Sequence, residues 1–301
     1  MEVNDLDDAI KRLSFYKLAD RHEDMARETI SILEMMHKEG KEMDEFVREN
    51  FSLSHKNMLS PLRNSWRALM TEADKYKDDK ENHEYKILKE IIVKITNNIM
   101  EISDGVLDAI EKFVDLKEEE DQMINYVYFI KIKGDFYRYK AEVTIGPSRE
   151  EYRDMSFKYY SEAREKGNFL KASNPIWLGL ALNLSVLYYE TFENVEEALK
   201  LAQESFEAAI QQLDILTDEN YNESTLIMQL LRDNITLWTV QAKEKRMDSP
   251  LLQKHSQVDI EADLNSTKNE SNLNSTKNES LTESKLNETL NKSKMLEDNK
   301  L

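Results

Sequence analysis

Apolar residues recur every three or four positions along most of this chain, which is the spacing that places them on one face of an α-helix. Leu, Met, Ala, Glu and Lys dominate these stretches, and all five residue types favour helices. The pattern predicts an all-α protein with nine helices, at residues 3–19, 22–38, 44–74, 82–113, 120–144, 149–167, 175–192, 195–213 and 219–243.

Capping residues mark where several of these helices begin. Asn174 stands directly before a proline, an arrangement typical of a cap followed by the first helical position. Asn194 precedes an acidic segment and predicts another helix start. Ser148 and Glu151 have the spacing of a capping box, so we expect the sixth helix to begin just after Ser148.

The last part of the chain has a different character. Residues 246–301 are rich in Asn, Ser, Thr, Lys and Glu, and one eight-residue sequence occurs at 264–271 and again at 273–280. Such a segment buries too little apolar surface to offset its conformational entropy. The sequence therefore predicts a helical domain over 1–245 and a disordered low-complexity tail over 246–301.

Composition excludes several classes of function. The chain has no cysteine, so disulfides, thiolate metal sites and cysteine nucleophiles are absent. Six glycines and four prolines in 301 residues argue against a turn-rich β fold and against glycine-rich phosphate loops. The net charge of −18 disfavours nucleic acid as a partner, and no apolar run is long enough for membrane insertion. We expect no metal and no cofactor, and a cytoplasmic location, with the nucleus as a second compartment.

Two helices carry cations at matching intervals. Lys56 and Arg63 are seven residues apart and so share one helix face, and Lys131 and Arg138 repeat that spacing two helices later. Tyr139 follows Arg138 directly. Gathered from two helices, these side chains would suit a phosphate dianion.

Two acidic residues accompany Arg138 on its own helix. Asp135 lies one turn before it and Glu142 one turn after it. Carboxylates at these offsets can orient a guanidinium group by hydrogen bonds. Spacing alone also fits a second interpretation, in which all of these charges are solvated helix faces with ordinary ion pairs.

The seventh and ninth helices share another pattern, an asparagine flanked by apolar residues on one face. An asparagine in this setting can hydrogen-bond a peptide backbone while its neighbours hold side chains. The alternative is that these are core positions with satisfied asparagines. The residues are Leu182, Asn183, Val186 and Glu190 in the seventh helix and Leu226, Leu230, Asn234 and Trp238 in the ninth.

Three segments resemble signatures of the 14-3-3 family nearly residue for residue. They are YNESTLIMQLLRDNITLW at 221–238, KIKGDFYRY at 131–139 and GLALNLSVLYYE at 179–190. The resemblance extends over about residues 3–243 and is weaker in the N-terminal third. It implies nine antiparallel helices that form a cup with a concave peptide-binding groove, and a non-enzymatic adaptor that binds phosphorylated serine or threonine segments of client proteins.

The resemblance also implies roles for individual residues. The phosphate-binding positions match Lys56, Arg63, Arg138 and Tyr139. The peptide-binding positions match Lys131, Leu182, Asn183, Val186, Glu190, Leu226, Ile227, Leu230, Asn234 and Trp238. The seam of a homodimer, in which the first two helices of one subunit pack on the third and fourth of the other, involves Phe15, Tyr16, Arg21, Asp24, Ile91 and Lys94.

The chain departs from the family pattern in its third helix and at the dimer seam. His55 stands where a tyrosine is usual, and Pro61 lies between Lys56 and Arg63. Because a proline inside a helix removes a hydrogen bond and clashes with the preceding turn, we expect a kink that changes the relative placement of these two cations. At the seam, Arg21 faces a position where an acid is usual, which predicts a homodimer that mixes poorly with other members.

Two other functions remain open at this stage. One is a helical scaffold whose groove is distorted or self-occupied, and which binds unphosphorylated partners or its own phosphorylated tail, with Ser249 and Ser293 as candidate phosphosites. The other is an enzyme. The five histidines form no metal-ligand spacing, and no glycine loop or nucleophile motif is present, so we expect no catalytic residues.

Overall fold

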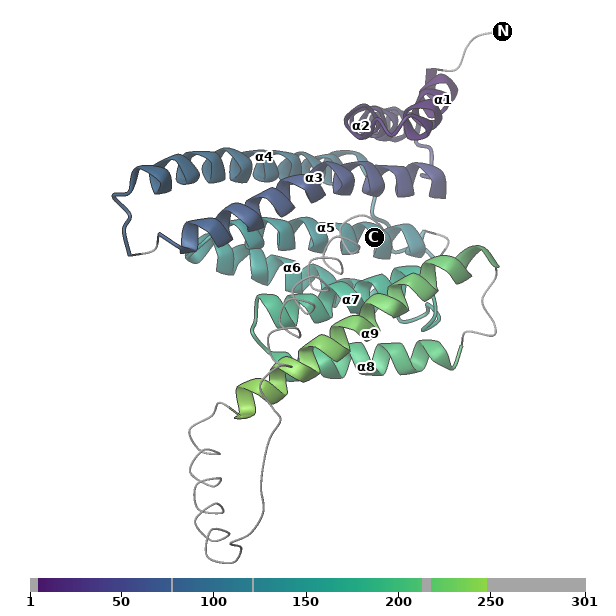
Figure 1. Cartoon of the computed structure of the whole chain (residues 1–301). Helices are drawn as coiled ribbons and strands as arrows, with labels where there is room; N and C mark the ends of the chain where they lie inside the picture. The colour runs from purple at the N-terminus through teal and green to yellow at the C-terminus, as the bar shows by residue number, and fades with distance from the viewer. Residues whose placement is uncertain (1–4, 77, 121, 213–217, 248–301) are drawn as a thin grey trace, which may run out of the picture.

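A computed structural model describes residues 5–76, 78–120, 122–212 and 218–247 of the chain, without the side chains of 218–220 and 244–247. These residues form nine α-helices and no β-strand, in agreement with the sequence pattern (Figure 1). The helices are α1 (Asp5–Leu18), α2 (His22–Glu39), α3 (Glu45–Asp74), α4 (His83–Phe113), α5 (Met123–Val143), α6 (Pro147–Lys166), α7 (Pro175–Glu190), α8 (Val195–Ile210) and α9 (Asp218–Met247).

Side-chain caps fix several helix starts. The Asp44 carboxylate accepts a hydrogen bond of 2.8 Å from the backbone N–H of Val47, which satisfies one free donor in the first turn of α3. Asn174 caps α7 by accepting from the backbone N–H of Ile176 at 2.9 Å. Asn194 caps α8 in the same way. The two asparagine caps expected from the sequence are therefore confirmed.

The expected capping box of the sixth helix is wrong. Helix α6 begins at Pro147, so Ser148 already lies inside it, and the preceding Gly146 makes no side-chain cap. Gly146 has a φ of 64°, a conformation that a residue without a Cβ adopts readily. Proline then supplies a helical φ at a position where its missing N–H costs nothing. The glycine–proline pair therefore starts the helix without a capping side chain.

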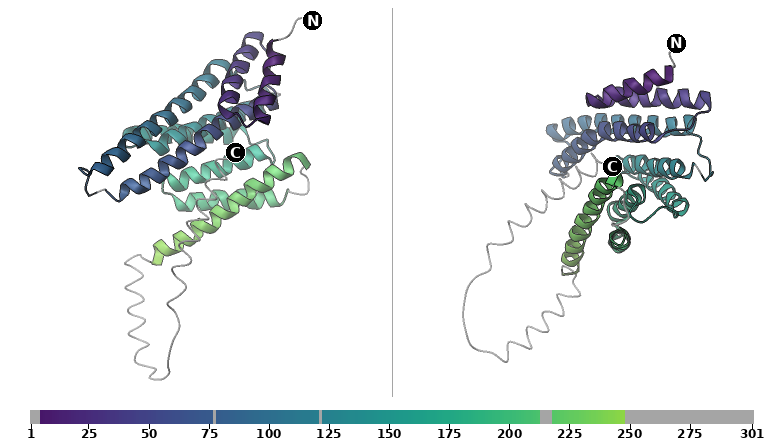
Figure 2. Two further views of the ribbon diagram at one scale, coloured as in Figure 1. Left: turned by 45° about the horizontal axis from the view of Figure 1, so that its top comes forward. Right: turned by 90° about the vertical axis from the view of Figure 1, so that its right-hand side faces the viewer.

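The helices pack as successive layers (Figure 2). Helices α1 and α2 lie against each other, α2 packs on α3 and α4, and α4 packs on α5. Helix α5 has its most extensive packing with α6, and α9 lies across α7 and α8. One hydrophobic core joins α1 to α5, a second joins α5 to α8, and a third lies among α7, α8 and α9. Helix α5 therefore belongs to two cores and links the halves of the molecule.

Helix α3 continues through Pro61 without interruption from Glu45 to Asp74. Lys56 and Arg63, on either side of the proline, both have buried side chains and both reach α5. Both cations therefore converge on α5 in spite of Pro61. The displacement expected from a kink has not moved either of them away from that helix. The kink itself remains a prediction.

Several expectations fall outside the described residues, among them the tail phosphosites Ser249 and Ser293 and the first two positions of the first helix, at 3 and 4. Among the helices that are described, none combines the length and the apolarity needed to cross a membrane. Within the same residues, no group of three or more His, Asp or Glu side chains is arranged to hold a metal ion.

Candidate functional site

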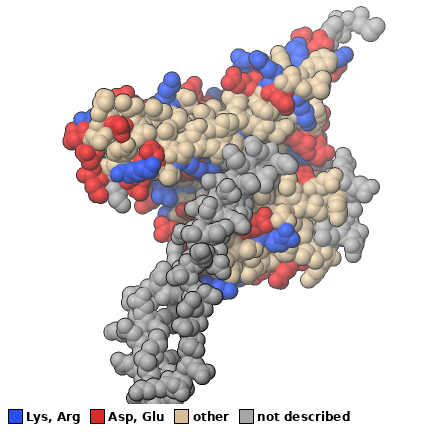
Figure 3. Space-filling model, in the orientation of Figure 1, with Lys and Arg blue, Asp and Glu red and all other residues tan. Residues whose placement is uncertain are grey.

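The four residues matched to phosphate binding lie on facing sides of α3 and α5. The ammonium group of Lys56 is 3.0 Å from Oδ2 of Asp135, and Nε of Arg63 donates to Oε2 of Glu142 at 2.6 Å. Both pairs run from α3 to α5, so each carboxylate of α5 holds a cation of α3. Figure 3 shows Lys and Arg atoms along the border of the hollow between the α3–α4 half and the α7–α9 half of the molecule.

Tyr139 brings the two arginines together. The guanidinium carbon of Arg63 is 4.1 Å from the centroid of the Tyr139 ring, and that of Arg138 is 4.9 Å from it. These distances are within the range of cation–π attraction, which is stronger where water is excluded. All three side chains are buried. The ring of Tyr139 therefore helps to fix the two guanidinium groups relative to each other.

Asp135 is the centre of the lysine half of the site. Its Oδ2 contacts Nζ of Lys131 at 3.2 Å in addition to Lys56. Its Oδ1 accepts hydrogen bonds of 2.6 Å from the hydroxyl of Tyr160 on α6 and of 2.6 Å from the amide nitrogen of Asn183 on α7. Asp135 is completely buried, so these contacts offset the cost of removing its charge from water.

The carboxylates of the site stay ionised at neutral pH. Burial alone would raise the pKa of Asp135, but Lys131 and Lys56 outweigh burial and lower the pKa well below its ordinary value. Burial likewise acts to raise the pKa of Glu142, and Arg63 and Arg67 overcome it, lowering the pKa to about 2. Five cations gather around Asp135 and Glu142 in this network: Lys56, Arg63, Arg67, Lys131 and Arg138. The carboxylate of Glu223 on α9 also interacts electrostatically with Lys131 and Lys56.

The acidic residues do not orient Arg138 in the way their spacing suggested. Asp135 and Glu142 form their close contacts with cations of α3 and with Lys131, whereas Nε of Arg138 donates to the Tyr160 hydroxyl at 3.4 Å. Tyr160 was not recognised from the sequence, because its role depends on how α6 packs against α5. Arg67, which donates to Glu142 at 2.5 Å, was missed for the same reason.

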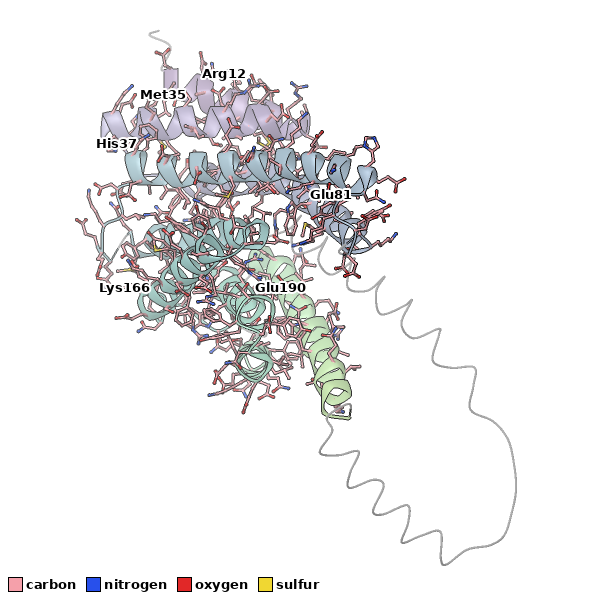
Figure 4. The ribbon with its side chains drawn as sticks, turned by 90° about the vertical axis from the view of Figure 1, so that its left-hand side faces the viewer. Arg12, Met35, His37, Glu81, Lys166 and Glu190 are labelled. Atoms are coloured by element: carbon pink, nitrogen blue, oxygen red, sulfur yellow. The ribbon has the colours of Figure 1, made fainter. Side chains whose placement is uncertain are left out.

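The residues matched to peptide binding divide into two groups. The first is part of the core among α7, α8 and α9 and comprises Leu182, Val186, Ile227, Leu230 and Trp238, while Leu226 is only partly buried. The second is polar: Asn183 and Asn234 are buried on α7 and α9, and Glu190 lies at the C-terminal end of α7 near α9 (Figure 4). Trp238 stacks on Tyr189, the neighbour of Glu190, with ring centroids 4.7 Å apart.

A cavity of about 530 Å³ opens beside the cationic residues. Its walls come from the N-terminal parts of α3, α5 and α7 and from α9, and include Glu49, Ser52, Tyr128, Ile176 and Glu223. Ser52 lies one turn before Lys56 on α3, and Tyr128 lies about one turn before Lys131 on α5. The cavity therefore continues the concave surface away from the cations, along the same helix faces.

The residues matched to a dimer seam lie on α1, α2 and α4, away from the cationic site. Phe15 is 60% exposed and Ile91 is 42% exposed, while Tyr16 is partly covered and Lys94 faces solvent. Arg21 donates to Asp24 of the same chain at 2.6 Å. A protomer therefore presents exposed apolar side chains at this face, whereas its Arg21–Asp24 pair is already formed internally.

Comparisons with known proteins were consistent with one another. A family model described as 14-3-3 protein matches residues 12–239. The chain is 39% identical over 240 residues to a 14-3-3 protein homolog of Encephalitozoon cuniculi, an alignment that covers 79% of this chain and 93% of the relative. It is 38% identical over 221 residues to 14-3-3 protein 2 of Entamoeba histolytica, covering 73% and 90%. It is 35% identical over 246 residues to 14-3-3 protein beta/alpha-A of Xenopus laevis, covering 81% and 98%.

Proposed function

The chain belongs to the 14-3-3 family, and we propose that it is an adaptor that recognises phosphoserine or phosphothreonine in client proteins by means of Lys56, Arg63, Arg138 and Tyr139. Family membership supports a phosphopeptide-binding role in general and a protein that acts without catalysis. The assignment of the individual residues is our proposal.

The observation that carries the proposal is the cluster of cations at the junction of α3 and α5. The side chains of Lys56, Arg63, Lys131 and Arg138 are buried there, and the partly buried Arg67 joins them through Glu142. A phosphorylated side chain carries about −1.5 to −2 charges at pH 7 and has three acceptor oxygens. Bound among these cations, it would form charge-assisted hydrogen bonds with them.

The rest of a client segment would lie across the hollow toward α7 and α9. The amide nitrogen of Asn183 already donates to Asp135, so we propose that its Oδ1 accepts a hydrogen bond from a backbone N–H of the client. Asn234 would bond the backbone farther along the groove. The cavity lined by Ser52 and Tyr128 would receive residues that neighbour the phosphorylated one.

We further propose that two copies associate through the α1, α2 and α4 face. Phe15 and Ile91 expose apolar surface there, and covering such surface is the main favourable contribution to association. Because Arg21 and Asp24 pair within one protomer, the seam would depend more on apolar contact than on ion pairs between subunits. A homodimer would present two grooves to one client or to two clients.

The test is fluorescence anisotropy of a labelled Arg-x-x-phosphoSer-x-Pro peptide and its unphosphorylated twin, titrated with the full chain. We expect binding of the phosphorylated peptide alone. Replacing Arg138 with alanine should weaken binding by at least about 30-fold, because losing one partner of a buried charge pair costs about 2 kcal/mol or more. Arg149→Ala is the matched control, since Arg149 is an exposed arginine at the start of α6.

Equal binding of the two peptides would refute phosphate recognition and would favour a scaffold for unphosphorylated partners. Equal loss of affinity in Arg138→Ala and Arg149→Ala would mean that binding reflects overall charge and not this site. Binding of neither peptide by the full chain, with recovery in a chain that ends at residue 245, would indicate that the groove is occupied by the tail.

A further inference from the structure

One hydroxyl group joins the lysine half and the arginine half of the cationic site. The Tyr160 hydroxyl donates its proton to Oδ1 of Asp135 at 2.6 Å, and the same oxygen accepts a hydrogen bond from Nε of Arg138 at 3.4 Å. Asp135 in turn holds Lys56 and Lys131 through its other oxygen. Tyr160 thus contacts the groups that set the positions of three cations.

The ring of Tyr160 is held in place by close packing between α5 and α6. At Gly134 of α5, an added Cβ would lie 2.6 Å from two carbon atoms of the Tyr160 ring, closer than such atoms approach in folded proteins. The hydroxyl of Ser156, one turn before Tyr160, donates to the backbone oxygen of Gly134 at 2.9 Å. A glycine inside a helix normally weakens it, so its presence here fits a requirement for this close approach.

We propose that Tyr160 is a positioning residue for the phosphate site, which acts through Asp135 and Arg138 and does not itself touch the bound phosphate. This inference rests on the proposed function, because it assigns Tyr160 to the geometry of that same site. Tyr160 is fully buried. It therefore contributes by fixing the carboxylate and the guanidinium at the separation that the phosphate oxygens require.

The electrostatics of the site keep the hydroxyl protonated, as a donor must be. Burial and the neighbouring Asp135 carboxylate both raise the pKa of Tyr160 well above its ordinary value, and the opposing effect of Arg138 is smaller. The tyrosine thus donates to Asp135 over the whole pH range in which the protein would bind a phosphate dianion.

The alternative explanation is that Tyr160 serves only to pack α6 on α5. The chain offers a matched control for this alternative. Tyr126 on α5 is also buried, and its hydroxyl donates to Glu162 of α6 at 2.6 Å. Tyr126→Phe and Tyr160→Phe therefore each delete one hydroxyl that bonds the same two helices, but only the Tyr160 hydroxyl contacts the cationic site.

The experiment compares phosphopeptide affinity in the wild-type chain, Tyr160→Phe and Tyr126→Phe. We expect Tyr160→Phe to bind about tenfold more weakly, the usual effect of deleting one hydrogen bond to a charged group, and Tyr126→Phe to bind like the wild type. Gly134→Ala, which forces the Tyr160 ring to move while keeping its hydroxyl, should weaken binding in the same direction.

Phosphorus NMR of the bound peptide gives a readout that a role in packing alone would not change. A free phosphomonoester takes up its second proton with a pKa of about 6, and surrounding cations lower that value. In the complex with Tyr160→Phe the bound phosphate should titrate at higher pH than in the wild-type complex, because its cations are less well placed. In the complex with Tyr126→Phe it should titrate as in the wild type.

Wild-type affinity and an unchanged phosphorus titration in Tyr160→Phe would overturn the positioning role while leaving phosphate recognition intact. Equal weakening in the two tyrosine variants would also overturn it, since the effect would then belong to α5–α6 packing. Failure of the wild-type chain itself to bind the phosphopeptide would instead overturn the proposed function, and the positioning role with it.

Discussion

Replacing His55 should make the protein less sensitive to acid. His55 lies on α3, one residue before Lys56, and is buried against the ring of Phe51, with centroids 4.7 Å apart. Its Nδ1 lies 2.7 Å from the backbone oxygen of Phe51, so this nitrogen carries a hydrogen and donates it. Burial lowers the pKa of His55 from 6.5 to about 4, because the charged imidazolium would lose its hydration.

The sign and size of the effect follow from proton binding in the two states. Between pH 6.5 and about 4 the unfolded chain protonates this histidine while the folded chain keeps it neutral, so acid favours unfolding in that window. Each pH unit is worth about 1.4 kcal/mol, which gives a loss of about 3 kcal/mol across the window. Below about pH 4 both states are protonated and the loss stops growing.

Urea unfolding at several pH values between 7 and 4 measures this contribution, with protein concentration held fixed because the chain is expected to dimerise. Two variants, His55→Phe and His55→Asn, differ in the packing defect they create but both remove the titrating group. The free energies of unfolding of the two variants should differ at pH 7. When the pH is lowered to 4, however, the free energy of unfolding of each variant should decrease by about 3 kcal/mol less than that of the wild type. Parallel pH profiles for all three proteins would refute the argument that His55 is buried in its neutral form.

Two further predictions concern the cationic site and the seam. Glu142→Gln should lower the free energy of unfolding, measured by urea titration, by about 3 kcal/mol, because Arg63 and Arg67 lose the negative charge that both contact. A change under about 1 kcal/mol would show that these ion pairs contribute little to stability. Phe15→Glu should convert the proposed dimer into monomers by sedimentation without lowering protomer stability, since Phe15 is 60% exposed; an unchanged dimer would place the seam elsewhere.

Helix positions could be predicted from the sequence because hydrophobic periodicity and capping residues, the two signals that mark them, are both local. Periodicity placed all nine helices, and residues such as Asn174 and Asn194 fixed starts by bonding to backbone groups within three residues. Helix ends were less accurate: α8 ends at Ile210 and not at 213, and α9 extends to Met247. The end of α8 has no glycine or proline within the next three residues to mark it, so the sequence does not show where its last turn stops.

The site was predictable only as far as its residues resemble a family signature. The resemblance identified Lys56 and Arg138, and the structure places both against α5 and α6 partners. Tyr160 has no signature of its own, because its contact with Asp135 depends on how closely two helices approach. Gly134 was the available clue: a glycine inside a helix indicates a close neighbour without naming it.

A simple count of charge would suggest that a phosphate site improves when its carboxylates are removed. The geometry argues the opposite for Asp135 and Glu142, because each holds a cation of α3 against α5. Without these carboxylates the clustered cations would repel one another and turn toward water, and a ligand would have to reassemble them on binding. The network still places five cations beside these two carboxylates, and together these cations would attract a phosphate dianion. The carboxylates therefore weaken the electrostatic attraction for the phosphate, but they hold the cations in their binding positions before the ligand arrives. Where the groups are buried, this prior arrangement favours binding more than the lost attraction disfavours it.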